Sequence, residues 1–251
     1  MLFNYHTHTF RCQHASGTEM EYIENAIKRG IQTLGFSDHV PYIFPDGYVS
    51  KCRMLPKETS GYFNTVRALA KEYSGKIRIL CGFEAEYYPT FYKDNMEALK
   101  KYSPDFFILG QHFLGDEPEG RVVSGSKTED ALNEYVDQTL AALSTGDFLY
   151  FAHPDVIGYR GDEGVMEKSF TRLCEGARDM NIPLEINLLG IRTGRHYPDI
   201  RFFEIAKKVG NKVILGIDAH SPDQMLHPTD EKEAMDMVNG LGLELIREPI
   251  L

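Results

Sequence analysis

Two histidines separated by one threonine, His6 and His8 in "HTH", stand near the beginning of the chain. On a strand, side chains i and i+2 point to the same face, so this spacing presents both imidazoles to one centre. Asp218 and His220 repeat the spacing in "DAH" near the other end. Imidazole and carboxylate groups together suit divalent Zn, Fe or Mn. An isolated HxH is nonspecific, however, and more often marks ordinary surface or core histidines.

The elements that must position these residues alternate regularly. Strand patterns cover 2–6, 33–39, 77–88, 106–112, 148–155, 183–189 and 212–220, and helical patterns cover 18–30, 57–73, 91–101, 128–144, 164–180, 199–209 and 229–240. Thr18 and Glu21 have the spacing of a capping box, and Gly30 is typical of a helix end. Repeated strand–helix units predict a parallel sheet, either open or closed into a barrel. No GxGxxG or GxxxxGK[ST] motif supports a nucleotide-binding open sheet.

Nearly every histidine falls at the carboxyl end of a predicted strand. The titratable residues at these ends are His6, His8, Asp38, His39, Glu84, Glu86, His112, His153, Asp155, Asp218 and His220. In a parallel barrel these ends converge on one face, where such barrels carry their chemistry. So many carboxylates and imidazoles in one cleft would repel and desolvate one another without bound cations. The distribution therefore predicts divalent metal ions, with Cys12 a weaker candidate for a soft ligand.

Bulk properties restrict the class of protein. The 251 residues fit one α/β barrel domain, and 42% hydrophobic and 25% charged residues are ordinary for a globular protein. The net charge of -10 argues against binding to nucleic acid or to anionic membranes. No secretory signal or membrane-spanning run is apparent, and the four scattered cysteines fit reduced thiols. We expect a cytoplasmic protein; the sequence leaves a homodimer open.

Eight segments share their order and spacing with a known family. They are "HTHT", "CQHASGT", "GFSDHVPY", "GFEAEYY", "GQHF", "FAHPD", "LEINLLGIR" and "GIDAHSP". Together they resemble the polymerase and histidinol phosphatase (PHP) superfamily, and within it the monofunctional histidinol-phosphate phosphatases. The resemblance spans essentially the whole chain. It implies one domain over 1–251, folded as a distorted (β/α)7 TIM-like barrel with a three-metal site at the carboxyl ends of the strands.

The resemblance also implies a set of ligands for each of the three metal ions. The first ion would be held by His6, His8, Glu84 and Asp218, the second by Glu84, His112 and His153, and the third by His14, His39 and His220. Glu84 is preferred to Glu86 as the bridging ligand because it completes the family's GxE pattern, but both lie on one strand face. Asp38 is expected to orient an imidazole rather than to bind metal. Its alternative role is a strand-end cap.

The chemistry that follows is hydrolysis of a phosphomonoester by a hydroxide between two metal ions, so no protein nucleophile is needed. Asp218, His220 and Glu84 are the expected catalytic residues. Arg160 and Arg192 follow strands and are the candidates for binding the phosphate, because a guanidinium is bidentate and permanently charged. The alternative for each is a surface ion pair. Arg195, His196 and His227 match no family motif.

The leading functional hypothesis is histidinol-phosphatase, which converts L-histidinol phosphate and water to L-histidinol and phosphate in histidine biosynthesis. The main alternative is a PHP-type phosphoesterase for another small phosphoester, a nucleotide or a phosphotyrosine protein. A metal-binding module without catalysis would lack ligands, and the sequence lacks none of those expected. A deacetylase on a similar barrel would carry a lysine or another bridging group at the position of Glu84.

Overall fold

The computed structural model describes residues 1–44, 47–125 and 128–251. Its strands are β1 (Phe3–Asn4), β2 (Thr33–His39), β3 (Arg78–Ala85), β4 (Phe107–Leu109), β5 (Phe113–Leu114), β6 (Arg121–Val122), β7 (Leu184–Asn187), β8 (Lys212–Gly216) and β9 (Glu244–Leu245). Its α-helices are α1 (Glu19–Arg29), α2 (Thr59–Glu72), α3 (Tyr92–Leu99), α4 (Glu129–Leu143), α5 (Glu163–Asp179), α6 (Leu188–Arg192), α7 (Ile200–Val209) and α8 (Pro228–Leu241). The expected alternation of strands and helices is confirmed except between α4 and α5, where no strand is assigned in the described chain.

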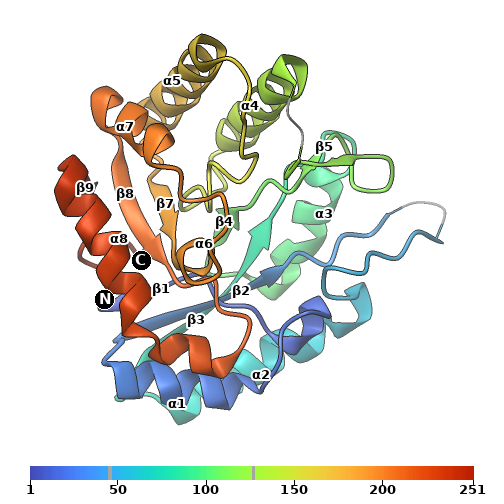
Figure 1. Ribbon diagram of the computed structural model, residues 1–251. Coiled ribbons are helices and arrows are strands. Elements are labelled where there is room, and N and C mark those ends of the chain that lie inside the picture. Colours follow the sequence, from blue (N-terminus) through green and yellow to red (C-terminus); the bar gives the residue numbers. More distant parts are fainter. Residues whose placement is uncertain (45–46, 126–127) are drawn as a thin grey trace.

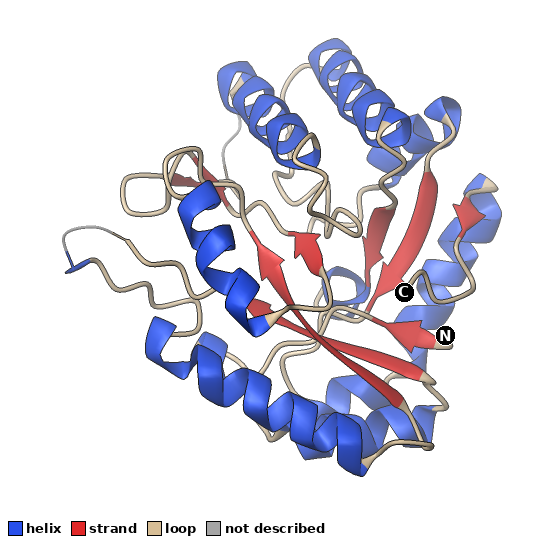
Figure 2. Ribbon diagram, turned by 180° about the vertical axis from the view of Figure 1, so that it is seen from behind, coloured by secondary structure: helices blue, strands red, loops and turns tan. Residues whose placement is uncertain are grey.

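The strands form a curled parallel sheet with helices around its outside (Figures 1 and 2). One sheet has the order β1-β2-β3-β4 and another the order β7-β8-β9, with parallel pairing throughout. Isolated parallel bridges join Leu109 to Phe151, Phe151 to Leu184, and Thr7 to Ala219. The chain termini lie close together beside α8 in both views.

The prediction of a strand over 148–155 is wrong, because Phe151 is the only residue of this segment that is assigned a strand bridge. Leu149 and Ala152 still donate to backbone oxygens of β4, at 2.8 Å each. The extended conformation stops at His153, whose φ is 31°, and Pro154 follows with no N–H to donate. The segment therefore contributes one short rung to the sheet.

β1 is shorter than the predicted 2–6 because a side chain interrupts its ladder. The Asn4 amide donates to the carbonyl of His6 at 3.0 Å and accepts the backbone N–H of Ile217 at 2.8 Å. Three elements had no counterpart in the predictions: the antiparallel hairpin β5–β6, the short helix α6 and the edge strand β9. The start of α1 is as predicted, with the capping box of Thr18 and Glu21 formed and Gly30 at φ 86°.

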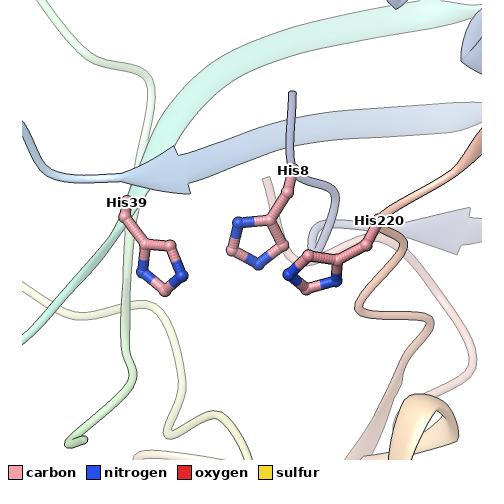
Figure 3. A group of neighbouring side chains, drawn as sticks. All are labelled: His8, His39 and His220. Carbon is pink, nitrogen blue, oxygen red and sulfur yellow. The ribbon is translucent and has the colours of Figure 1, made fainter. Parts of the chain in front are cut away.

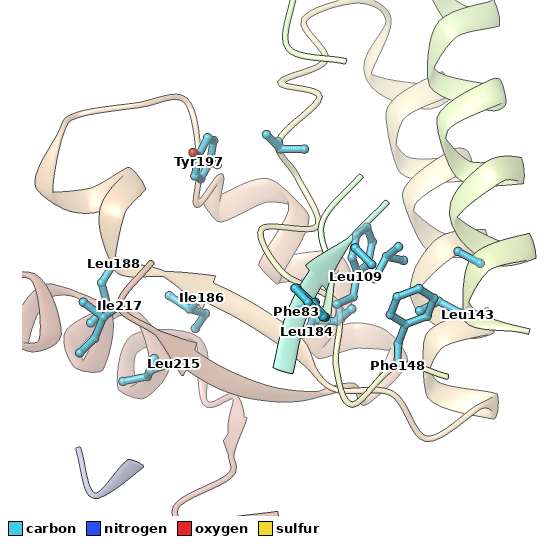
Figure 4. Packing of buried hydrophobic residues seen from close by; sticks show 14 of the residues in the cluster. Phe83, Leu109, Leu143, Phe148, Leu184, Ile186, Leu188, Tyr197, Leu215 and Ile217 are labelled. Carbon is cyan, nitrogen blue, oxygen red and sulfur yellow. The ribbon is translucent and has the colours of Figure 1, made fainter. Parts of the chain in front are cut away.

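Alternation along the strands separates two hydrophobic clusters. Outward-facing residues such as Phe83, Leu184 and Leu215 pack against the helices in the larger cluster (Figure 4). The smaller cluster contains Phe3, Tyr5, Leu80, Phe106, Ile108, Tyr150, Ala152 and Ile214. Leu80 shares a strand face with Glu84, four residues on, so the face that carries the smaller cluster also carries the titratable groups at the strand ends.

Candidate metal centre

Imidazoles and carboxylates from distant parts of the sequence meet at the carboxyl ends of the strands. Glu84, 1% exposed, lies at their centre. Its Oε2 is 3.5 Å from His6 Nε2, 3.4 Å from His8 Nε2 and 3.3 Å from His39 Nδ1. Its Oε1 is 2.8 Å from His153 Nε2 and 3.6 Å from His112 Nε2. Glu84 thus faces five imidazoles with its two oxygens.

Asp218 forms the second carboxylate of this group. Its Oδ1 lies 3.2 Å from His8 Nε2 and 3.4 Å from His6 Nε2. His6 and Asp218 are brought together by the Thr7–Ala219 bridge between the segments that follow β1 and β8. The backbone of Asp218 has φ 51°, a left-handed conformation that a non-glycine residue adopts at a cost. Together with His153, it places two strained residues in the candidate site.

A third set of imidazoles borders the same group. His8, His39 and His220 lie side by side (Figure 3). The rings of His8 and His220 are stacked with centroids 4.1 Å apart, and those of His8 and His39 are tilted with centroids 4.6 Å apart. Ligand atoms of these three lie within 4.8 Å of one another. His14 is exposed, with its ring 4.9 Å from that of His220. Cys12, His14 and His220 also form a group of this kind, so Cys12 borders the site.

Several of these atoms are buried without a hydrogen-bond partner among the described residues. They are His6 Nε2, His8 Nδ1 and Nε2, His39 Nδ1, His153 Nδ1 and Asp218 Oδ1. Buried polar atoms are normally satisfied, because an unpaired one costs about 1–3 kcal/mol. Unpaired imidazole nitrogens beside carboxylate oxygens are a donor set that fits divalent metal ions.

Electrostatics of the group follow from burial and close packing. Burial disfavours ionised Glu84, but the imidazoles of His39, His112 and His6 outweigh it and hold the pKa of Glu84 well below its usual value. The pKa of Asp218 is likewise held low, mainly by His6 and His8. Burial and the neighbouring His8 lower the pKa of His220 to about 3, so this imidazole is neutral. Despite burial, the neighbouring carboxylates hold the pKa of His6 and His8 well above its usual value, so metal binding, which needs ionised carboxylates and neutral imidazoles, would release protons from these two residues.

Glycines on the inner face leave room for the central carboxylates. A Cβ at Gly110 would lie 1.8 Å from Glu84 Oε1, and one at Gly216 would lie 1.8 Å from Glu185 Oε1. Either contact is far below any real separation, so each carboxylate requires the glycine beside it.

Two residues expected near the site have other partners. Asp38 accepts the backbone N–H of His39 at 2.8 Å and that of Thr9 at 3.3 Å. It lies 3.8 Å from His8 Nδ1, beyond hydrogen-bond distance. Glu86, the alternative to Glu84 as the bridging ligand, also lines the cavity, but it accepts from His112 Nδ1 at 2.9 Å and from Arg53.

The two arginines predicted to bind phosphate lie outside the cavity. This cavity, of about 920 Å³, is lined by the candidate ligands His8, His14, His39, Glu84, His112, His153, Asp218 and His220, and also by Glu86, Cys52, Phe113, Val122, Ser124, Val156, Leu189, Gly194, Arg195, His196, Tyr197 and Gln224. Arg192 instead pairs with buried Asp230 at 2.6 Å. Arg160 is half exposed and lies 3.5 Å from Asp199. Arg195, which the motifs did not indicate, does line the cavity.

Glu185 is a buried carboxylate that the sequence analysis missed. It is fully buried in β7, where Oε1 accepts from His6 Nδ1 at 2.8 Å and Oε2 accepts the backbone N–H of His153 at 3.0 Å. Its contact with His6 directs the other ring nitrogen, Nε2, towards Glu84 and Asp218. The available signal was one glutamate between apolar neighbours in "PLEINLL", where alternation turns it away from Leu184 and Ile186.

Comparison with known proteins identifies the family. The PHP domain model matches residues 4–188, so the chain belongs to the PHP family. A probable histidinol-phosphatase of Deinococcus radiodurans is 27% identical over 234 residues, covering 89% of this chain and 88% of that protein. Another, of Schizosaccharomyces pombe, is 26% identical over 257 residues, covering 90% and 82%.

The fold is also that of a solved member. The crystal structure of histidinol phosphate phosphatase from Lactococcus lactis, complexed with zinc, L-histidinol and phosphate, superimposes with a TM-score of 0.74. It is 20% identical and the match covers 97% of this chain and 95% of that one. Within the described residues, no helix is both long and apolar enough to cross a membrane.

Proposed function

We propose that this protein is a metal-dependent phosphatase that hydrolyses L-histidinol phosphate to L-histidinol and phosphate. The observation that carries the proposal is the group of unpaired, buried imidazole and carboxylate atoms around Glu84, which borders the 920 Å³ cavity. A cavity of this size suits a small ligand. The proposal agrees with the names of the relatives from Deinococcus radiodurans and Schizosaccharomyces pombe and with the Lactococcus lactis complex.

The donor set supports three divalent ions, with Zn, Fe or Mn as candidates. We assign His6, His8, Glu84 and Asp218 to one ion, Glu84, His112 and His153 to another, and His14, His39 and His220 to the third. The Lactococcus lactis protein was crystallised with zinc. Divalent ions at such sites supply Lewis acidity to phosphoryl oxygens and lower the pKa of water.

The chain's own residues have three tasks in this mechanism. Glu84 and Asp218 remain ionised and keep the imidazoles close together. Glu185 fixes the ring of His6, and Glu86 that of His112. Arg195 is our candidate for binding the phosphate, because it lines the cavity and has a donor fork that matches phosphate oxygens. The roles predicted for Arg160 and Arg192 require both side chains to leave Asp199 and Asp230.

We also propose that the chain forms one domain over 1–251, with the sheet curled into a distorted seven-stranded (β/α)7 barrel. The pairings between β4, Phe151 and β7 and between Thr7 and Ala219 support it, because they connect neighbours all the way around the curl. The smaller hydrophobic cluster would fill the interior below the metal centre, as side chains fill other α/β barrels.

Steady-state kinetics of the metal-loaded protein test the function. The panel contains L-histidinol phosphate, other small phosphomonoesters, a nucleotide and a phosphotyrosine peptide, with single-stranded DNA as a polyanion. We expect kcat/KM to be highest for L-histidinol phosphate, by about a hundredfold or more, as for sites that bind polar substrate groups. Similar values for all phosphomonoesters would refute the substrate, and no turnover at full metal content would refute the phosphatase.

A further inference from the structure

Arg53 is a buried cation whose position the metal centre does not by itself explain. It lies in the loop between β2 and α2, is 1% exposed, and is among the largest fully buried side chains of the described chain. A buried guanidinium is costly unless it is fully paired. Its partners therefore indicate what it does.

The guanidinium donates to two carboxylates, to one tyrosine hydroxyl and to one backbone carbonyl. Nη1 and Nη2 donate to the two oxygens of Glu86, at 3.0 and 3.2 Å, in the bidentate arrangement that is the strongest for arginine. Nε donates to Glu117 at 2.7 Å, Nη2 to Tyr88 Oη at 2.8 Å, and Nη1 to the carbonyl of Val40 at 3.2 Å. The side chain is thus held at all three nitrogens.

Glu86 carries this arrangement to the metal centre. The same Oε1 that accepts from Arg53 Nη2 also accepts from His112 Nδ1, at 2.9 Å. His112 therefore carries its proton on Nδ1, and its Nε2 lies 3.6 Å from Glu84 Oε1. The ring of His112 lies 4.9 Å from that of His153 and 5.3 Å from that of His39, between centroids, and the side chain is 28% exposed. A hydrogen bond with a fixed carboxylate orients the ring.

The loop that carries Arg53 is held on its other side by the segment that carries His14. Gln13 Nε2 donates to the carbonyls of Ser50 and Arg53, at 3.1 and 2.7 Å. Backbone and side chain of Arg53 are therefore both fixed relative to the strand ends.

We infer that Arg53 is a positioning residue that acts through Glu86 on His112, so that metal affinity at the ion held by His112 depends on it. The inference rests on the proposed function for the assignment of His112 as a ligand. Arg53 binds neither metal nor substrate in this arrangement. It holds Glu86 in the orientation that keeps His112 Nε2 directed at Glu84.

Cobalt binding to the full chain tests this directly. The chelator-treated protein is titrated with Co²⁺, and affinity and visible absorption are recorded for wild type, Arg53→Lys, Glu86→Gln and the double variant. We expect each single variant to weaken one class of Co²⁺ site by about ten- to a hundredfold and to change its absorption band, as for other partners of metal-bound histidines. The double variant should match Glu86→Gln alone, because the effect of Arg53 passes through Glu86.

Arg29→Lys is the matched control. Arg29 is half-buried, with a side chain 9% exposed, and it pairs with a glutamate, Glu231 at 2.7 Å, between α1 and α8; it does not line the cavity. It should leave Co²⁺ affinity and spectrum unchanged. A folded Arg53→Lys variant with the affinity and spectrum of wild type would overturn the inference, and so would additive losses in the double variant.

If circular dichroism shows that Arg53→Lys does not fold, the inference is tested with Glu86→Gln and Tyr88→Phe instead. Tyr88→Phe removes one acceptor of Arg53. Wild-type Co²⁺ affinity in both would overturn the inference. Turnover of L-histidinol phosphate by the wild type is measured separately. If the wild type shows no turnover but the variants lose Co²⁺ affinity as expected, the proposed function is refuted and the positioning role of Arg53 stands. If the wild type turns over substrate but the variants bind Co²⁺ as the wild type does, the positioning role is refuted and the proposed function stands.

Discussion

The cavity has two sides of different construction. The ligand side, so called for its candidate metal ligands, consists of His8, His14, His39, Glu84, His112, His153, Asp218 and His220, and the loop side of Leu189, Gly194, Arg195, His196 and Tyr197. The ligand side contains buried atoms with no partner among the described residues. On the loop side, Arg195 donates to Tyr197 Oη at 2.6 Å and His196 Nε2 to the carbonyl of Val156 at 2.7 Å. One side therefore requires cations, whereas the other is already hydrogen-bonded and can present substrate contacts.

The largest expected effect comes from removing a ligand. Asp218→Asn or His8→Ala should abolish phosphatase activity, by more than the ten- to hundredfold typical of residues that only orient ligands. The fold should persist, because the hydrophobic clusters are untouched. Steady-state kinetics at saturating metal and circular dichroism measure the two quantities. Unchanged turnover in either variant would remove the distinction between the two sides.

Metal removal should destabilise the protein through the ligand side. A ligand at a hundred times its Kd stabilises the folded state by about 2.7 kcal/mol, so each ion lost should lower Tm by roughly 5–10 °C. Thermal melts with and without a chelator measure the shift. Asp218→Asn should show a smaller shift than wild type. Equal melting temperatures of wild type in the two conditions would contradict metal binding at this centre.

Two glycine substitutions separate the sides. A Cβ at Gly110 would lie 1.8 Å from Glu84 Oε1, whereas one at Gly158, which has φ 59°, would lie 2.4 Å from the ring of His196. Gly110→Ala should lose metal and most activity. Gly158→Ala should keep its metal content and lose about tenfold in kcat/KM, roughly 1.4 kcal/mol of binding to the transition state. Atomic absorption and kinetics distinguish them.

Gly61→Ala is the control for this pair, because a Cβ there meets no atom within 4 Å in helix α2. It should be neutral or stabilising by up to about 1 kcal/mol. Metal loss in Gly158→Ala would show that the two sides are not independent.

The smallest effects distinguish three arginines on the loop side and beyond it. Arg195→Ala should raise KM about tenfold, the lower value for losing a charged hydrogen bond. Arg192→Ala should leave KM unchanged but lower the free energy of unfolding by about 3 kcal/mol, because Asp230 stays buried without its partner. Arg160→Ala should change stability by less than about 0.5 kcal/mol. A raised KM for Arg160→Ala or Arg192→Ala would instead favour the motif-based prediction.

The ligand side could be predicted because strand order encodes it. Parallel strands end on one rim, so His39 and Glu84 could be placed together from their positions in sequence alone. The position of Arg195 depends on how the loop after α6 turns. The position of Arg53 depends on how the loop between β2 and α2 packs against the end of β3. Such loops are fixed by tertiary contacts, as when Gln13 binds the carbonyl of Arg53. A local sequence pattern does not contain information on such tertiary contacts.

Tertiary contacts and short elements also explain where the predicted strands differ from the observed ones. Apolar alternation over 148–155 predicted a full strand, but Pro154 and the left-handed backbone of His153 end it early. β1 was shortened by the side chain of Asn4, which takes the place of a neighbouring backbone group. The hairpin β5–β6 and strand β9, of two residues per strand, are too short for any periodic signal.

The bridge between Thr7 and Ala219 also determines when the metal centre can form during folding. His6 and Asp218 are 212 positions apart in sequence and become neighbours only after the intervening chain has been ordered. Closure of so large a loop is entropically unfavourable until other contacts offset it, and contacts of high sequence separation slow folding. We therefore expect the centre to form after the curled sheet has folded rather than as a folding nucleus. In refolding experiments, the cobalt absorption band should appear no earlier than the slowest gain of tertiary structure.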